Sequence, residues 1–267
     1  MSNSTLLSYL FQPSSLDETT IIALEKQMTE ILKTNGVKTP IIHFTGEDQT
    51  EKVIIYSHGN GSDLSTHYMD RIMHNGFKMD MICYDYCGYG AAQKYGNETT
   101  EDLCVKNLKS VVEYALQCGY HAEDVILFGR SIGTGVTISY AAQHPDTYGK
   151  IILTSPMTSA VDFIKPLLMK LPNKTKNELG QTDAFTTLDK IDQINVPMFI
   201  IHGTFDSIIP FSQGNEIWKK HQETFSKLRR KPYEPYWIVG GDHNNYLNVC
   251  SMIVYCNIIC NFINYKE

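Results

Sequence analysis

Short apolar runs alternate with longer amphipathic segments along most of the chain. Most of these runs are apolar throughout, which is typical of strands that are covered on both faces of a sheet. Helix-length segments lie between them, and this order predicts an α/β fold with a mostly parallel central sheet flanked by helices. The expected strands are residues 41–44, 53–56, 81–84, 125–128, 151–154, 197–201 and 236–239.

The segments between the runs space their apolar residues as helices do. Residues 18–33 precede the first strand, so we interpret residues 1–40 as an N-terminal accessory segment and residues 41–267 as the main domain. The C-terminal stretch 249–263 is interrupted by Asn257 and Asn261, which favours a buried helix over a membrane span. The other expected helices are residues 64–74, 99–117 and 135–143.

Composition and charge restrict the partners that this chain can have. It has 267 residues, 42% of them hydrophobic, and fits one large domain. A net charge of -6 provides no global positive field, so we expect no nucleic-acid partner. Peripheral membrane contact needs a local patch, and the basic cluster, defined as Lys227, Arg229, Arg230 and Lys231, is the candidate for binding acidic lipid headgroups. The composition does not indicate an oligomeric state.

The cysteines and the N-terminus indicate a cytoplasmic protein. The seven cysteines lie mostly in apolar stretches and lack paired metal-type spacing, so we interpret them as reduced core thiols. Residues 1–11 have neither a basic region nor a long apolar region, so no signal peptide is predicted. We expect no metal and no organic cofactor.

The motif Gly129-Arg130-Ser131-Ile132-Gly133 directly follows the expected strand 125–128 and opens a helix-compatible segment. A strand, a tight turn and a helix form the context that a nucleophile elbow requires, with the serine hydroxyl exposed at the turn. The flanking glycines allow that turn to close. The sequence therefore predicts Ser131 as a nucleophile.

Two further strand ends carry the partners that a weak serine nucleophile needs. Asp206 follows strand 197–201, and His243 follows strand 236–239. Each alone is compatible with a structural turn residue, but together they give the chain order Ser, Asp, His expected for a hydrolase built on a parallel sheet. After strand 53–56, the glycine-rich turn 58–61 can present the backbone N–H of Asn60 to an oxyanion, together with that of Ile132. A plain turn is the alternative.

These stretches resemble the α/β-hydrolase superfamily and, within it, the protein depalmitoylases of the alpha/beta-hydrolase-domain-17 type. The resemblance implies an α/β-hydrolase fold and a serine esterase or thioesterase acting on acyl groups, in such relatives on S-palmitoylated cysteines. It does not extend to their lipidated, cysteine-rich N-terminus, since residues 1–44 contain no cysteine, and Arg130 stands where those relatives tend to have glutamine. The matching stretches are 57–60, 84–90, 129–134, 201–206 and 241–244.

Residues 157–195 interrupt the alternation with an insert longer than the usual connection. We interpret it as a short lid whose apolar residues Phe163, Leu167 and Leu168 contact the substrate, although a helix packed on the sheet edge fits equally well. The expected substrate is an acylated small molecule, a lipid or an S-acylated protein. Alternatives are a small-ester carboxylesterase, a lysophospholipase, a serine peptidase, or a non-catalytic binding scaffold with the same fold.

Overall fold

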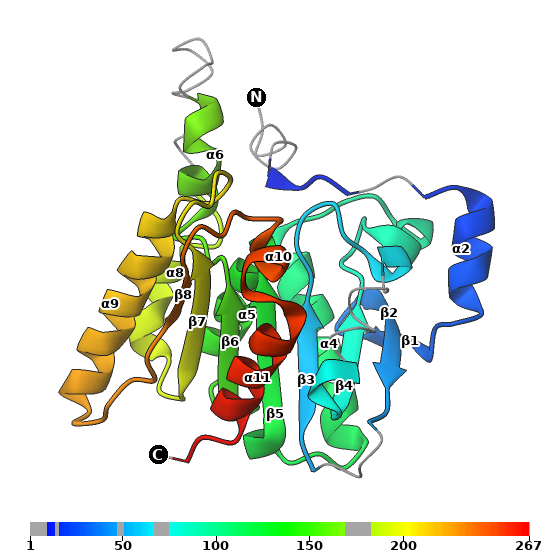
Figure 1. The fold of residues 1–267 in the computed structure, drawn as a ribbon. Coiled ribbons are helices and arrows are strands. Elements are labelled where there is room, and N and C mark those ends of the chain that lie inside the picture. Colours follow the sequence, from blue (N-terminus) through cyan, green and yellow to red (C-terminus); the bar gives the residue numbers. More distant parts are fainter. Residues whose placement is uncertain (1–9, 14–15, 47–50, 67–74, 169–182, 267) are drawn as a thin grey trace.

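The computed structural model describes residues 10–13, 16–46, 51–66, 75–168 and 183–266. A sheet of eight strands forms its centre, in the order β1-β2-β4-β3-β5-β6-β7-β8 (Figure 1). β2 pairs antiparallel with both β1 and β4, and the other neighbours pair in parallel. The predicted fold class is confirmed. The strands are β1 Glu30–Thr34, β2 Val37–Phe44, β3 Val53–Ser57, β4 Asp80–Tyr84, β5 Val125–Arg130, β6 Lys150–Thr154, β7 Met198–Gly203 and β8 Tyr236–Ile238.

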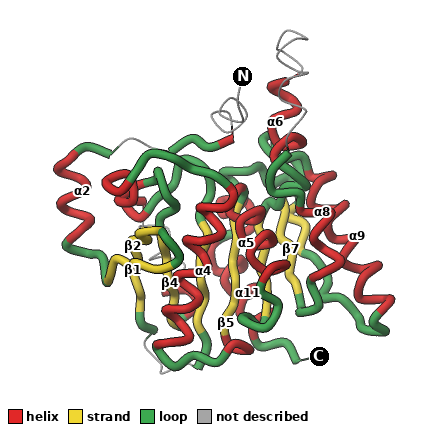
Figure 2. Tube along the Cα trace, turned by 180° about the vertical axis from the view of Figure 1, so that it is seen from behind, coloured by secondary structure: helices red, strands yellow, loops and turns green. Residues whose placement is uncertain are grey.

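Helices cover both faces of the sheet. α4 and α5 lie on the face seen in Figure 2, and α11 lies on the face seen in Figure 1. None of the described helices is both long and apolar enough to cross a bilayer. The α-helices are α2 Glu18–Glu25, α4 Glu101–Gln117, α5 Ile132–Gln143, α6 Ala160–Leu168, α8 Thr187–Lys190, α9 Phe211–Lys227, α10 Tyr246–Cys250 and α11 Met252–Ile263, and the 3-10 helices are η1 Leu64–Thr66, η2 Gly90–Tyr95, η3 Ala122–Asp124 and η4 Ile191–Gln193.

Alternate residues of the central strands enter two separate cores, which explains why these strands are apolar throughout. In β3, Val53 and Ile55 join the core that contains α4 and α5, whereas Ile54 joins the core that contains α11. Successive strand side chains point to opposite faces, so a strand covered on both sides must be apolar at every position. The central strands identified from the sequence, β3, β4, β5, β6 and β7, are of this kind.

The N-terminal region differs from the prediction. The expected helix over residues 18–33 ends at Glu25, and residues 30–34 form β1 instead. Asn35 and Gly36 both have positive φ, 55° and 76°, and form the turn of a β1–β2 hairpin. Asn-Gly is the preferred pair for such a turn, and this local signal outweighed the helical spacing of Ile31 and Leu32. Residues 30–40 therefore belong to the sheet, not to an accessory segment.

The first part of the insert lies at the upper edge of the sheet in Figure 1, where α6 projects above the strands, and α8 and η4 then lead back to the start of β7. The upper edge is the carboxyl edge, because α6 follows β6 and α10 follows β8. Residues 169–182 of the insert lie outside the described residues. So does most of the expected helix 64–74, of which the structure describes η1.

Candidate active site

Ser131 occupies a strained turn between β5 and α5. Its backbone has φ 54° and ψ -122°, a conformation that non-glycine residues rarely adopt. A Cβ atom at Gly129 would overlap the carbonyl oxygen of Gly133, and one at Gly133 would overlap the carbonyl oxygen of Ser57. The glycines thus allow the helix to approach β3 and β5 closely, which is the arrangement predicted for the elbow.

The fold brings the three predicted side chains together at the carboxyl edge of the sheet. His243 Nε2 lies 3.1 Å from Ser131 Oγ, and His243 Nδ1 lies 2.8 Å from Asp206 Oδ2. All three residues are at least nine-tenths buried, with 4% of Ser131, 5% of His243 and 7% of Asp206 exposed. This chain of hydrogen bonds is the one through which a histidine can take the proton of a serine hydroxyl.

Asp206 is held as a carboxylate by several donors. Its Oδ1 accepts hydrogen bonds from the backbone N–H of Ile208 at 3.0 Å and of Ile209 at 2.7 Å. Burial raises the pKa of the Asp206 carboxyl, but hydrogen bonds from His202 and His243 outweigh it and hold the pKa well below its usual range. The carboxylate therefore stays ionised to orient the His243 ring.

His202, a residue that the sequence did not single out, is a second histidine on this carboxylate. Its Nε2 lies 3.0 Å from the carbonyl oxygen of Ile209 and 3.3 Å from Asp206 Oδ2. Both atoms are acceptors, so Nε2 carries the proton. The fully buried His202 ring thereby provides Asp206 with a further donor besides His243. Nothing in the local sequence marks His202 as a partner of Asp206.

Arg130 connects the elbow to the loop that carries His243. Its Nη2 donates to the carbonyl oxygen of His243 at 3.1 Å and to Asn244 Oδ1 at 3.0 Å. The guanidinium also lies over the Tyr246 ring, 5.8 Å from its centroid. In the sequence, Arg130 was visible only as a departure from the related motif. In the structure, its hydrogen bond to the carbonyl oxygen holds the backbone of His243 in place.

The loop after β3 lies directly against the nucleophile. A Cβ atom on Gly59 would be 3.3 Å from Ser131 Cβ, so the Gly59 backbone touches the elbow. Asn60 is the next residue, and Ile132 begins α5 immediately after Ser131. Within the described ranges, neither the Asn60 nor the Ile132 backbone N–H has an acceptor in the protein. Both donors remain available, as an oxyanion hole requires.

The predicted lid residues are only partly described. Phe163 in α6 is half-buried and packs against the same core as α5, as a helix packed on the sheet would. Leu167 and Leu168 belong to α6, but their side chains lie outside the described part. Contact of these three residues with a substrate stays a prediction.

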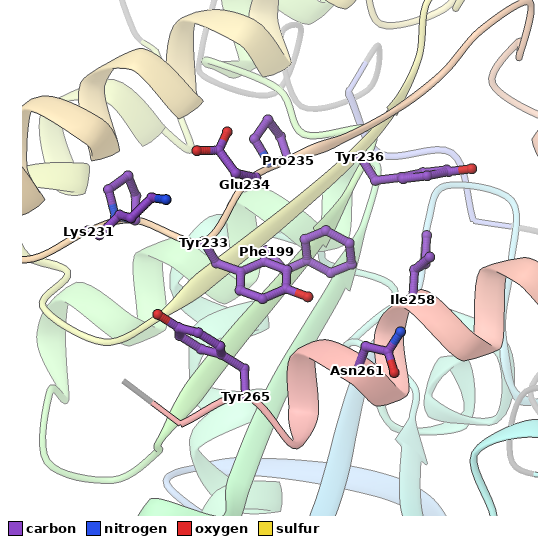
Figure 3. Close-up of a pocket in the computed structure, with 10 residues that line it drawn as sticks. Phe199, Lys231, Tyr233, Glu234, Pro235, Tyr236, Ile258, Asn261 and Tyr265 are labelled. Carbon is purple, nitrogen blue, oxygen red and sulfur yellow. The ribbon is translucent and has the colours of Figure 1, made fainter.

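A cavity of about 410 Å³ lies away from the Ser131 site. Its lining includes Phe199 and Tyr236 from the first residues of β7 and β8, together with Tyr233, Asn261 and Tyr265 (Figure 3). Phe199 and the segment 231–235 that leads into β8 lie toward the amino edge of the sheet, whereas Asp206 and His243 follow the carboxyl ends of β7 and β8. This cavity is therefore not the binding site for a substrate of Ser131.

A mostly parallel sheet that carries a serine elbow after β5, an aspartate after β7 and a histidine after β8 defines the α/β-hydrolase class. The chain belongs to this family, close to the alpha/beta hydrolase domain-containing protein 17 group. A family model described as serine aminopeptidase, S33, matches residues 48–183.

Two relatives and one solved structure illustrate this similarity. The chain is 33% identical over 220 residues to a protein of Acanthamoeba polyphaga mimivirus named as an alpha/beta hydrolase, covering 80% of this chain and 76% of that protein. It is 30% identical to human alpha/beta hydrolase domain-containing protein 17B, covering 84% of this chain and 70% of that protein. An esterase of Pyrococcus furiosus has the same fold, with a TM-score of 0.67, 18% identity, and coverage of 94% of this chain and 98% of the esterase.

Proposed function

We propose that this chain is a serine hydrolase that cleaves acyl thioesters and esters through an acyl-serine intermediate. The observation that carries the proposal is the continuous path from Ser131 Oγ through the His243 ring to the ionised Asp206 carboxylate. The preferred substrate class is S-acylated protein cysteines. This substrate class is supported by the similarity to the alpha/beta hydrolase domain-containing protein 17 group and by the exposed apolar side chains beside the site.

The first half of the reaction forms the acyl-serine. Ser131 Oγ attacks the carbonyl carbon of the substrate while His243 Nε2 takes the hydroxyl proton. Asp206 stabilises the imidazolium, and the carbonyl oxygen becomes an oxyanion bound by the N–H groups of Asn60 and Ile132. When the tetrahedral intermediate collapses, the bond to the leaving sulfur or oxygen breaks, and His243 returns the proton to it.

The second half releases the acid. Water attacks the acyl carbon while His243 takes one of its protons, and a second oxyanion forms in the same position. Its collapse breaks the bond to Ser131 Oγ, which regains a proton from His243. The products are a free carboxylic acid and the original thiol or alcohol.

Two exposed apolar side chains lie on the loops that carry Asp206 and His243. Phe205, next to Asp206, is 73% exposed, and Val239, just after β8, is 79% exposed. The two loops are hydrogen-bonded to each other, since Phe205 N–H donates to the carbonyl oxygen of Gly241. We propose that this apolar rim, defined as Phe205 and Val239, contacts the acylated substrate or the membrane that holds it. The basic cluster lies at the last residue of α9 and just after it, toward the opposite edge of the sheet, which argues against its predicted role in such contact.

Labelling with a fluorophosphonate probe tests the chemistry. We expect the wild type to be labelled and Ser131→Ala to remain unlabelled, because the probe reacts only with an activated serine. Circular dichroism of both proteins provides the control for folding. An unlabelled, well-folded wild type would instead support a non-catalytic scaffold.

Acyl specificity is tested with matched thioesters and oxygen esters of increasing chain length. Each buried methylene contributes about 0.8 kcal/mol, so a groove for fatty chains should give kcat/KM values that rise steeply with chain length. We expect a long-chain optimum and cleavage of an S-palmitoylated peptide. A preference for short chains would indicate a small-ester carboxylesterase, and faster cleavage of lysophosphatidylcholine would indicate a lysophospholipase.

A further inference from the structure

Residues 10–12, here named the N-terminal strap, lie against the loop that carries Asn60, although about 50 positions separate them along the chain. Leu10 is fully buried and Phe11 is 7% exposed. Both join the core that contains Ile132, and the Phe11 ring meets the Phe185 ring edge-on with centroids 6.0 Å apart. The strap is thus an integral part of the molecule at the carboxyl edge of the sheet.

The strap and Tyr89 together occupy three of the four hydrogen-bonding positions of the Asn60 side chain. Its Nδ2 donates to the carbonyl oxygen of Leu10 at 2.5 Å. Its Oδ1 accepts from the backbone N–H of Gln12 at 3.1 Å and from the Tyr89 hydroxyl at 2.5 Å. A carbonyl can only accept and a backbone N–H can only donate, so these partners fix the orientation of the amide.

The main chain of the same loop is held from two sides. The N–H of Gly61 donates to the carbonyl oxygen of Gln12 at 3.2 Å. On the other side, the Gly59 backbone touches Ser131, and a Cβ atom there would also lie 3.0 Å from Arg130 Nη1. Asn60 therefore lies between the strap and the nucleophile elbow, with little freedom to move.

We propose that the strap and Tyr89 position the backbone N–H of Asn60 for the oxyanion. This inference rests on the proposed acyl-serine chemistry. An oxyanion donor contributes most when its place is fixed before the charge develops, because no reorganisation is then needed. Gln12 and Tyr89 are positioning residues, since they act through the Asn60 side chain and not on the substrate.

The test compares Gln12→Pro with Gln12→Ala. Proline removes the N–H that Asn60 Oδ1 and Tyr89 accept, but keeps the carbonyl that binds Gly61. Alanine keeps both backbone groups and is the matched control. Tyr89→Phe is the second variant, because it removes the hydroxyl donor while keeping the buried ring.

The measurements are kcat and KM for a p-nitrophenyl ester, the melting temperature, and the inhibition constant of a trifluoromethyl ketone, which forms a tetrahedral oxyanion on the serine. For Gln12→Pro and Tyr89→Phe, we expect kcat to fall about 10-fold or more and trifluoromethyl ketone affinity to fall in step. KM and the pH profile should stay close to those of Gln12→Ala, because the histidine and aspartate are untouched.

Three results would overturn the inference. One is a Gln12→Pro protein with the kcat of Gln12→Ala. Another is a lower kcat with unchanged trifluoromethyl ketone affinity, which would separate the strap from the oxyanion. If Gln12→Pro does not fold, a Tyr89→Phe protein with the kcat of the wild type would overturn the inference instead. A wild type that is not labelled by fluorophosphonate would overturn the proposed function itself, and so the two failures are distinguishable.

Discussion

At the scale of single residues, two members of the candidate triad are held by neighbours of different chemistry. Asp206 accepts from His202 as well as from His243. The backbone of His243 is fixed by Arg130, whose guanidinium is also stacked on an aromatic ring. Placement within a few tenths of an ångström is what lets such groups act together, so these neighbours should matter for rate although they do not touch the substrate.

Replacement of Arg130 by Met tests whether a residue that only positions His243 affects the rate. The variant loses the hydrogen bonds to the His243 carbonyl oxygen and to Asn244, and we expect kcat to fall on the order of 10-fold with little change in KM. Arg130→Lys keeps a cation at the site and should recover part of the rate. Steady-state kinetics of both variants provide the measurement. A kcat of Arg130→Met equal to that of the wild type would remove Arg130 from the set of positioning residues.

At the scale of elements, the elbow depends on the close packing of α5 against β3 and β5. The strained Ser131 backbone persists only because the surrounding contacts determine it. Gly133 is the point of closest approach, since its α-carbon faces the carbonyl oxygen of Ser57. Any side chain at this position must push the helix away from the sheet.

We therefore expect Gly133→Ala to lose about 2–3 kcal/mol of unfolding free energy through overpacking and to lose fluorophosphonate labelling through displacement of Ser131. Urea denaturation and labelling measure the two effects. Gly61→Asn is the control, because position 61 has open space and a φ of 67° that asparagine tolerates. Labelling of Gly133→Ala at the wild-type rate would show that the elbow adapts to a methyl group.

At the scale of the whole molecule, buried neutral histidines couple folding to pH. Burial lowers the pKa of both His58 and His221 to about 4. The His221 ring lies against Phe225 with centroids 4.2 Å apart, and among the described residues neither of its nitrogens has a hydrogen-bond partner. Between the unfolded pKa near 6.5 and the folded value, only the unfolded chain binds the proton, so stability falls as the pH falls.

His221→Phe should remove this effect at one site while filling the same space. On going from pH 7 to pH 5, we expect the wild type to lose about 2 kcal/mol more unfolding free energy than the variant. Urea denaturation at the two pH values checks this. Equal losses in both proteins would show that His221 is protonated in the folded state as easily as in the unfolded one.

The sequence by itself determined the sheet core and the elbow. Buried parallel strands can be recognised from the local sequence, because every residue of a run such as 53–56 must be apolar. The elbow can be recognised in the same way, because the serine and the flanking glycines that its turn requires all lie within residues 129–133. β1 was missed because Ile31 and Leu32 suit either a helix or a strand, and pairing with β2 decided between them.

Only the tertiary structure decided which groups support the candidate site. The bond from Arg130 to the His243 loop and those from the strap to Asn60 join residues that are distant in the sequence. Nothing in the local pattern distinguishes these side chains from solvated ones. Arg130 and the strap support the site because the fold places them at the carboxyl edge of the sheet, next to His243 and Asn60. That placement depends on the packing of the whole molecule.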